Sequence, residues 1–273
     1  MLRLPHSEIC IALSPHRVSL VRRRPGLRPA ILDKVTVPCL ASMAEPWRNQ
    51  LATLEGLVKQ EAWNSGDAVV ILSNHYTRYL LVPWSELLLD NEEALAYVRH
   101  LFGEIYGEAA ARHELRVSPE SPGAPRVASA VETNLVQGLR EILSASRLRL
   151  RSIQPYFMSA YNLHRKALGA DGWFAVAEAG QLCVAGRLQN RWLSIRNLRT
   201  GPDWGRDLKD YLARQQISAG TEALPQKIYW CAAEKQVQSP AMGPTWSIER
   251  LAAKTPAGIT PDSENAFAIA AYA

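Results

Sequence analysis

The chain has 273 residues, of which 47% are hydrophobic and 21% are charged, and its formal net charge is +5. These proportions are ordinary for a globular protein, so they exclude a disordered chain and a fibrous repeat. The length favours two compact lobes over one large core.

The four cysteines are widely spaced, and none forms a Cys-x-x-Cys pair. Three of them lie in apolar runs, which predicts buried free thiols in a reducing compartment rather than disulfides or zinc ligands. The segment from Met1 to Leu13 lacks the long apolar core of a secretory signal, and no window approaches the roughly 20 apolar residues that span a bilayer. We therefore expect a cytoplasmic protein that reaches a membrane through a partner or a surface patch.

The first segment predicts three strands, over Ile9–Leu13, Val18–Arg24 and Ala30–Val37, because apolar runs are separated there by turn residues. Pro25-Gly26 predicts a hairpin turn between the second and third strands. Four arginines gather around this turn, namely Arg22, Arg23, Arg24 and Arg28. Such a cluster binds nucleic acid or anionic lipid in some proteins. A turn with solvated charge is the simpler interpretation, and we expect no nucleic-acid partner.

Helical spacing follows these strands. Apolar residues recur from Trp47 to Val58 at intervals of three and four, so a helix from about Trp47 to Trp63 is expected to bury one face. Ala68–Leu72 is apolar at every position, which is typical of a central parallel strand covered on both faces. The polar run Ser73-Asn74-His75 follows this strand, where α/β proteins often form sites, although a plain loop is the alternative.

A smaller unit is expected next, inserted at about residues 79–120. It begins with a strand at Tyr79–Val82. A helix follows, whose apolar face is formed by Ala94, Val98, Leu101, Phe102 and Ile105. The prolines of Ser118–Arg126 predict a loop. Val127–Val131 is apolar except for Ser129, so we predict a second central strand there, parallel to Ile9–Leu13, with a helix after it.

The strand pattern then returns. After a strand with one solvated face, where Arg147, Arg149 and Arg151 alternate with apolar residues, the order of the first segment is repeated. The repeat consists of strands at Trp173–Glu178, Gln181–Leu188 and Trp192–Leu198, a helix at Trp204–Leu212, a strand at Ile228–Cys231 and an Ala-rich helix from about Ser263. Strands that alternate with helices indicate α/β architecture. The duplication predicts two lobes, residues 1–165 and 166–273.

This order of elements, with the residues at its turns, resembles the actin-like ATPase superfamily. Within it the chain is similar to the PilM-like family of type IV pilus assembly and to the cytoplasmic domains of GspL and MshI. The resemblance covers nearly the whole chain and implies an actin-like (RNase H-like) fold of duplicated βββαβα lobes, with mixed sheets that carry helices on both faces. Such ATPases usually insert a further subdomain between the third strand of the second lobe and the strand that follows. Here only Thr200 to Gln226 lies between them, so we expect this subdomain to be missing or much reduced, as it is in GspL-type relatives.

The resemblance places the family's first phosphate turn at Ser14. PilM-like proteins have Asp-x-Gly there and a lysine in the second strand. The glycine lets the backbone approach phosphate, and the carboxylate holds metal-bound water. In this chain Ala12 stands at the Asp position, Ser14 at the Gly position and Ser19 at the Lys position. Pro15 also removes an amide donor from the turn.

The other two nucleotide motifs are partly altered. Glu178-Ala179-Gly180 keeps a carboxylate and the glycine of the second phosphate turn. Ala232 and Ala233 replace the two glycines that end the family's adenosine strand. The resemblance therefore implies a vestigial nucleotide cleft without cofactor, metal or catalytic residue. Glu178 is either a residual catalytic carboxylate or an ordinary acidic residue of a hairpin turn.

The resemblance, together with these altered motifs, implies two alternative functions. The first is a non-catalytic scaffold or adaptor of an inner-membrane type IV pilus or type II secretion-like platform. Its implied partners are a bitopic PilN-like membrane protein, a secretion ATPase and a second copy of the chain. The alternative is a divergent ATP-dependent enzyme, such as a small-molecule kinase, in which His16 or Arg17 replaces the lost phosphate contacts. No P-loop, Rossmann, nucleophile-elbow or zincin motif is present in the sequence.

A partner surface is expected on the small unit. A groove between its helix and the first lobe would take an extended apolar peptide. Four residues of the helix would line this groove, namely Val98, Leu101, Phe102 and Ile105. The alternative is that the same helix face packs the small unit onto its neighbour.

Overall fold

The computed structural model describes residues 7–24, 30–40, 45–86, 91–201, 204–219, 224–232 and 239–252. Contacts divide the chain into two compact units. The first includes the chain up to Thr77 and Val131–Ser159, and the second consists of Arg78–Ala130 and Ala160–Ala252. Within the described ranges, no helix has both the length and the apolar character needed to cross a membrane.

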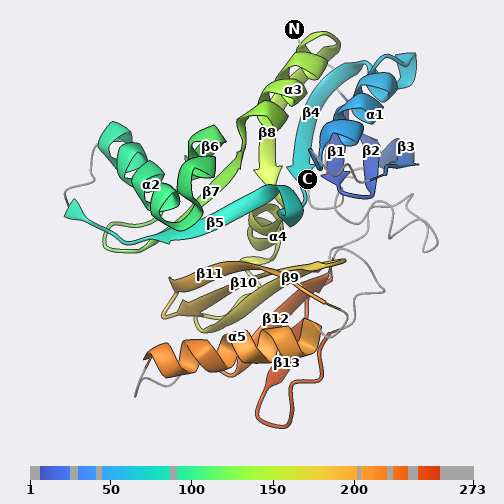
Figure 1. Cartoon of the computed structure of the whole chain (residues 1–273). Helices are drawn as coiled ribbons and strands as arrows, with labels where there is room; N and C mark the ends of the chain where they lie inside the picture. The colour runs from blue at the N-terminus through green and yellow to red at the C-terminus, as the bar shows by residue number, and fades with distance from the viewer. Residues whose placement is uncertain are drawn as a thin grey trace, which may run out of the picture. The chain divides into compact units, whose positions relative to one another are not determined.

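The first unit is built on a five-stranded mixed sheet (Figure 1). In spatial order its strands are β3 (Ala30–Pro38), β2 (Arg17–Arg24), β1 (Glu8–Ser14), β4 (Ser65–Leu72) and β8 (Arg147–Pro155). The strand β2 runs antiparallel to its two neighbours, β3 and β1, whereas β4 runs parallel to both β1 and β8. All five residues of Ala68–Leu72 are buried. The prediction of a central parallel strand is confirmed there.

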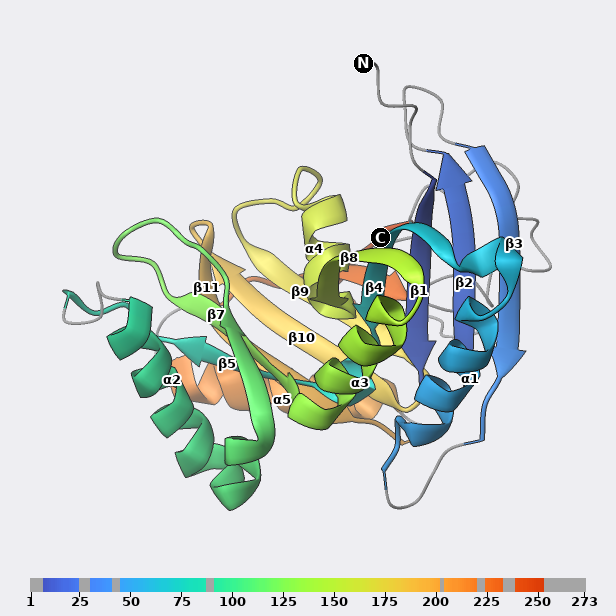
Figure 2. The same ribbon diagram turned by 90° about the horizontal axis from the view of Figure 1, so that it is seen from above.

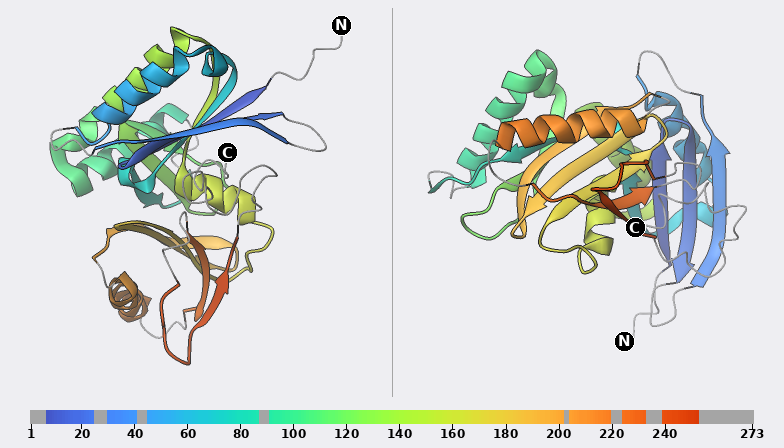
Figure 3. Two further views of the ribbon diagram at one scale, coloured as in Figure 1. Left: turned by 90° about the vertical axis from the view of Figure 1, so that its right-hand side faces the viewer. Right: turned by 90° about the horizontal axis from the view of Figure 1, so that it is seen from below.

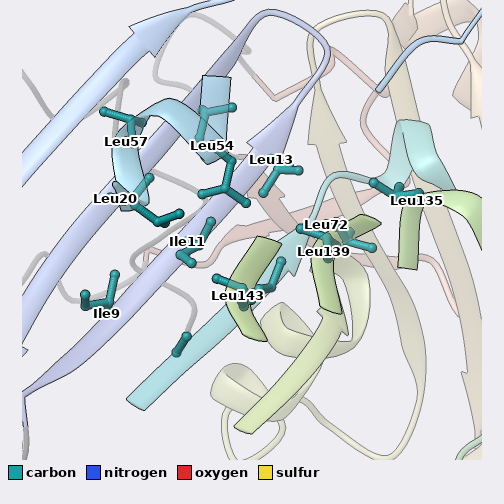
Figure 4. Close-up of a cluster of buried hydrophobic side chains, with 14 of the residues drawn as sticks. Ile9, Ile11, Leu13, Leu20, Leu54, Leu57, Leu72, Leu135, Leu139 and Leu143 are labelled. Atoms are coloured by element: carbon teal, nitrogen blue, oxygen red, sulfur yellow. The ribbon is translucent and has the colours of Figure 1, made fainter. Parts of the chain in front are cut away.

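Two helices, α1 (Arg48–Val58) and α3 (Thr133–Ser144), lie side by side on one face of this sheet (Figure 2). Their apolar stripes pack onto β1, β2 and β4 in one buried cluster, in which Leu143 lies near Ile11 and Leu139 lies near Leu72 (Figure 4). Burying one such leucine stabilises the fold by roughly 1.5–3 kcal/mol. The helix α1 ends earlier than predicted, because a 3-10 turn (Glu61–Trp63) carries the chain into β4.

The strand β8 has one solvated face, as its alternating sequence predicts. Arg147, Arg149 and Arg151 are exposed, whereas Leu148 between them is buried. The guanidinium of Arg149 donates to Asp67 Oδ1 on β4 over 2.7 Å. The arginines therefore form an exposed row held partly by an ion pair, which contributes little to stability.

The predicted small unit forms a separate three-stranded sheet. In spatial order its strands are β5 (Thr77–Val82), β7 (Arg126–Glu132) and β6 (His113–Val117), with α2 (Asn91–Tyr106) and a 3-10 helix (Gly107–Arg112) beside them. The prediction that Val127–Val131 belongs to the first sheet, parallel to β1, is wrong. This strand is central, but in the small sheet. An apolar run indicates burial on both faces without identifying the neighbouring strands.

The second lobe repeats the strand order of the first. Its strands, in spatial order, are β11 (Arg191–Arg199), β10 (Gln181–Leu188), β9 (Gly172–Glu178), β12 (Lys227–Ala232) and β13 (Ser247–Arg250). The helix α5 (Trp204–Ala219) lies on one face of this sheet (Figure 3). Both sheets have three antiparallel strands, a helix and a parallel central strand in the same order, so the duplication is confirmed. The four-residue β13 was not predicted, and the helix expected from Ser263 lies outside the described residues.

The helix α4 (Tyr156–His164) leads from β8 toward the second lobe and contains the division between the two units. The predicted lobe boundary at residue 165 stays a prediction. The contacts group the small sheet with the residues after Ser159, although its sequence is inserted into the first lobe.

Candidate functional site

The β1–β2 turn brings together the three residues that replace the family's first phosphate motif. Ala12 and Ser19 are direct cross-strand partners, and Ser14 pairs with Arg17 where the two strands meet. All three candidate residues are buried. The three positions therefore lie together at one turn, and the bonds of their polar atoms show how those atoms are used.

The two serine hydroxyls bond within the protein. Ser14 Oγ donates to the carbonyl of Arg17 over 3.2 Å, across the turn. Ser19 Oγ lies 2.9 Å from Thr36 Oγ1 on β3. Ala12 has no side-chain oxygen, so it offers nothing to a metal ion or to metal-bound water. These positions therefore carry neither a carboxylate nor a cation, and both serine hydroxyls already have partners.

Three neighbouring elements also hold the backbone of this turn. The amide of Ser73 donates to the carbonyl of Leu13 over 2.9 Å, and that of Cys39 donates to the carbonyl of His16 over 2.8 Å. Gln50 Nε2 donates to the carbonyl of Pro15 over 2.6 Å. Three carbonyls of this turn are bonded to the ends of β3 and β4 and to α1, so the turn cannot easily rearrange around a ligand. Its anchored groups are carbonyls, whereas phosphate requires N–H donors.

Gln50 is the residue of this site that the sequence analysis missed. It is fully buried in the first turns of α1. The signal was present, because Gln50 lies four residues before Leu54 and therefore on the buried face of the helix. A polar residue on such a face is a reason to look for a specific hydrogen-bond partner.

The polar run after β4 has structural roles. Ser73 Oγ accepts the amide of His75 over 3.2 Å and caps a short 3-10 helix (Asn74–Tyr76). The buried Asn74 Oδ1 accepts the amide of Phe157 over 3.1 Å, at the start of α4. These bonds support the interpretation of Ser73-Asn74-His75 as a loop that joins elements.

The second phosphate turn lies between β9 and β10. Glu178 is buried at the end of β9, opposite Gln181, and Gly180 has a φ of +76°, which a residue with a side chain adopts less readily. The amide of Thr200 donates to the carbonyl of Gly180 over 3.1 Å. Burial raises the pKa of the nearby Cys183 thiol well above its ordinary value, and the charge of Glu178 adds to that increase.

The end of β12 lies beside this turn. Ala232 pairs with Ala177, which directly precedes Glu178. The structure therefore brings Glu178, Gly180 and Ala232 together within the second lobe, as the resemblance implied, whereas Ala233 lies outside the described residues. The residues of the first turn belong to the first unit, whereas those of the second turn belong to the second unit. Among the described residues, no group of three His, Cys, Asp or Glu side chains is arranged to hold a metal ion.

The four residues predicted to line a partner groove have different environments. Val98 and Phe102 are buried in the core of the small unit, against Val82, Leu115 and the small side chains of β7. They cannot contact a peptide unless this unit rearranges, and they pack against the unit's own strands rather than onto a neighbouring lobe. Leu101 is half-buried, and Ile105 is 48% exposed, so only the outer part of this helix face is accessible.

No protein-family model and no curated protein matches the chain. Solved structures match its fold. A chain of the PilM–PilN type IV pilus biogenesis complex is 16% identical with a TM-score of 0.64, and the match covers 99% of this chain and 97% of that chain. The cytoplasmic domain of EpsL, an inner-membrane component of the type II secretion system of Vibrio cholerae, is 10% identical with a TM-score of 0.59, over 97% and 92% of the two chains.

A third similar structure is a protein of unknown function with an actin-like ATPase fold from Bacteroides thetaiotaomicron. It is 12% identical with a TM-score of 0.56, and the match covers 85% of this chain and 83% of that chain. Together with the two duplicated sheets, these similarities show that the chain has the actin-like ATPase fold.

Proposed function

We propose that this chain is a non-catalytic, actin-like scaffold of an assembly platform for a type IV pilus or a type II secretion-like system. The observation that carries the proposal is the β1–β2 turn. Ala12 replaces the family's metal-binding carboxylate, and the hydroxyls and carbonyls around it are bonded within the protein. A turn of this kind offers no side-chain carboxylate to a metal ion, and a phosphate would compete with the bonds that its two serine hydroxyls already make.

The fold similarity supports the assembly role, because the structures that match over nearly the whole chain include one from a pilus biogenesis complex and one from a secretion system. Our proposed partner is a bitopic, PilN-like inner-membrane protein whose cytoplasmic segment this chain binds. An assembly ATPase and a second copy of the chain are further proposed partners. In this role the chain is cytoplasmic and peripheral at the inner membrane.

One observation favours the alternative of a divergent ATP-dependent enzyme. Glu178 is a buried carboxylate beside a glycine with positive φ, in the turn that keeps most of the family pattern. Such an enzyme would use Glu178 as a base or metal ligand. It would also need a cation near the first turn, where His16 is exposed and Arg17 is half-buried. Fold alone does not decide between these functions, because function depends on the site.

The nucleotide test separates the two functions. We expect no thermal shift of the purified chain with millimolar Mg-ATP and no ATP hydrolysis. A ligand at 100 times its Kd would stabilise the protein by about 2.7 kcal/mol, which melting experiments detect readily. Glu178→Ala is the matched variant, and Mg²⁺ alone is the control. A saturable shift with Mg-ATP that this variant abolishes would overturn the scaffold proposal.

A further inference from the structure

The loop between β6 and β7, residues 118–125, contacts the second lobe through a tryptophan. Trp192 Nε1 on β11 donates to the Glu120 carboxylate over 3.0 Å. The Trp192 ring is almost completely buried, whereas Glu120 is exposed. The contact joins residues 72 positions apart, one in a loop of the small sheet and the other in the sheet of the second lobe, within the same unit. We call residues 118–125 the strap.

A buried arginine holds the tryptophan in place. Arg187 on β10 lies with its guanidinium carbon 5.7 Å from the ring centres of both Trp192 and Tyr161, the latter on α4. These two rings are themselves 4.7 Å apart. Arg187 also donates to the carbonyl of Gly169 over 3.1 Å and to Asn190 Oδ1 over 3.0 Å. Its charge is therefore compensated by bonds and aromatic faces, as burial requires.

The pairing of β10 with β11 is irregular at the residues that carry these side chains, Arg187 and Trp192. The register shifts between Gly186 and Arg187, so that Arg187 pairs with Trp192 and one residue of β11 is left over. A bulge of this kind redirects a side chain. The turn itself uses positive φ angles at Gln189 and Asn190, and the Asn190 amide donates to the carbonyl of Ala170 over 3.0 Å. The backbone thus presents Arg187 and Trp192 as a fixed pair.

The strap is restrained before it makes this contact. Prolines at 119, 122 and 125 limit its backbone freedom, so ordering it costs less entropy than ordering a flexible loop. The amide of Ser118 donates to the carbonyl of Val127, and that of Ala124 donates to the carbonyl of Ser121. A stiff loop that is bonded to a fixed tryptophan couples the movement of its own sheet to the strand that carries the tryptophan.

We propose that the strap fastens the small sheet to the second lobe, so that the small sheet moves with the lobe that follows it rather than with the lobe in which its sequence is inserted. The fastening consists of the Glu120–Trp192 hydrogen bond, and Arg187 and Tyr161 hold the Trp192 ring in position for it. A partner that binds the small sheet would then act on the second lobe directly. This inference is independent of whether the chain binds nucleotide.

Amide hydrogen exchange of the full chain tests this inference. Trp192→Phe keeps an aromatic ring against Tyr161 and Arg187 but removes the donor, and Glu120→Ala removes the acceptor. Because one hydrogen bond changes an opening equilibrium by roughly three- to tenfold, each variant should exchange faster by that factor in the strap and the small sheet. Exchange in β1 and β4 should not change. Glu120→Gln keeps an acceptor and should behave nearly as wild type.

The double variant decides whether the two residues act together. If they form one fastening, Trp192→Phe with Glu120→Ala should exchange no faster than either single variant. Effects that multiply in the double variant would overturn the proposal, as would wild-type exchange in the strap of Glu120→Ala. That second outcome is decisive even if Trp192→Phe fails to fold, because Glu120 is exposed and its removal leaves the core intact.

Discussion

At the scale of single residues, the centre of β4 should tolerate little change, because its side chains are fully buried. Val70 is completely buried and pairs with Ile11 on one side and Ile153 on the other. We expect Val70→Asp to lower the free energy of unfolding by roughly 3–5 kcal/mol, because an uncompensated charge is buried. Urea unfolding with Val70→Ala as control measures this difference. A loss for Val70→Asp no larger than that for Val70→Ala would contradict the placement of β4 in the core.

A buried thiol predicts a pH dependence. Burial raises the pKa of Cys10 from 9.0 to about 12, although the nearby Arg23 opposes the increase. The folded chain therefore retains a proton that the unfolded chain releases, so stability is fully present below about pH 9 and is lost as the pH rises toward 12. Cys10→Ala should reduce this slope by up to about 1.4 kcal/mol per pH unit.

Urea midpoints between pH 8 and pH 10.5 measure that slope, in the range where Cys10 titrates only in the unfolded chain. Cys39→Ala is the matched control, because Cys39 is a half-buried free thiol on the edge of the same sheet. Equal slopes for wild type and Cys10→Ala would mean that the Cys10 thiol is not held protonated by the fold.

At the scale of helices and strands, the spacing of apolar residues predicted most elements, because that spacing shows which face of a helix or strand is buried. It identified the solvated face of β8 and the buried stripe of α5, where Leu208 and Tyr211 are buried. It failed for the neighbours of β7, since a strand buried on both faces fits the centre of any sheet. It also missed β13, which has too few residues to show a pattern.

Two residues of α2 separate folding from binding. Phe102 is 1% exposed in the core of the small unit, and Ile105, on the same helix, is 48% exposed. Phe102→Ala should lower the free energy of unfolding by roughly 3–5 kcal/mol, whereas Ile105→Ala should change it by less than about 0.5 kcal/mol. If the small unit binds a partner's apolar segment, Ile105→Ala should weaken binding at unchanged stability.

Thermal melting and binding to the partner's cytoplasmic segment are measured in parallel for both variants. Full affinity of Ile105→Ala would exclude this face of α2 as the binding surface, while the proposed scaffold role would still stand on other grounds. A large loss of stability in Ile105→Ala would instead mean that this side chain packs in the fold.

At the scale of the whole molecule, the sequence indicated the duplicated α/β order, which the structure confirms, and two turns predicted to correspond to phosphate sites. It did not predict how the first turn is held. The bond from Gln50 to the carbonyl of Pro15 joins residues 35 positions apart and has no sequence motif. The strap is a similar case, because its Trp192 contact depends on a bulge in β11. Long-range polar contacts of this kind follow from tertiary geometry, which local patterns do not contain.

The proposed membrane attachment is a property of the whole chain and its partner. The net charge of +5 predicts weak adsorption to anionic vesicles at low ionic strength, which salt should remove, because exposed charges are screened within about 8 Å at 0.15 M. Arg24 is exposed, and Arg24→Gln should reduce this adsorption slightly.

At 0.15 M salt, the chain should sediment only with vesicles that carry the cytoplasmic segment of the bitopic partner, and the Arg24→Gln variant should do so equally well. Neutral vesicles without that segment are the control. Full sedimentation with plain vesicles at 0.15 M salt would show that the protein binds lipid by itself and would contradict attachment through a partner.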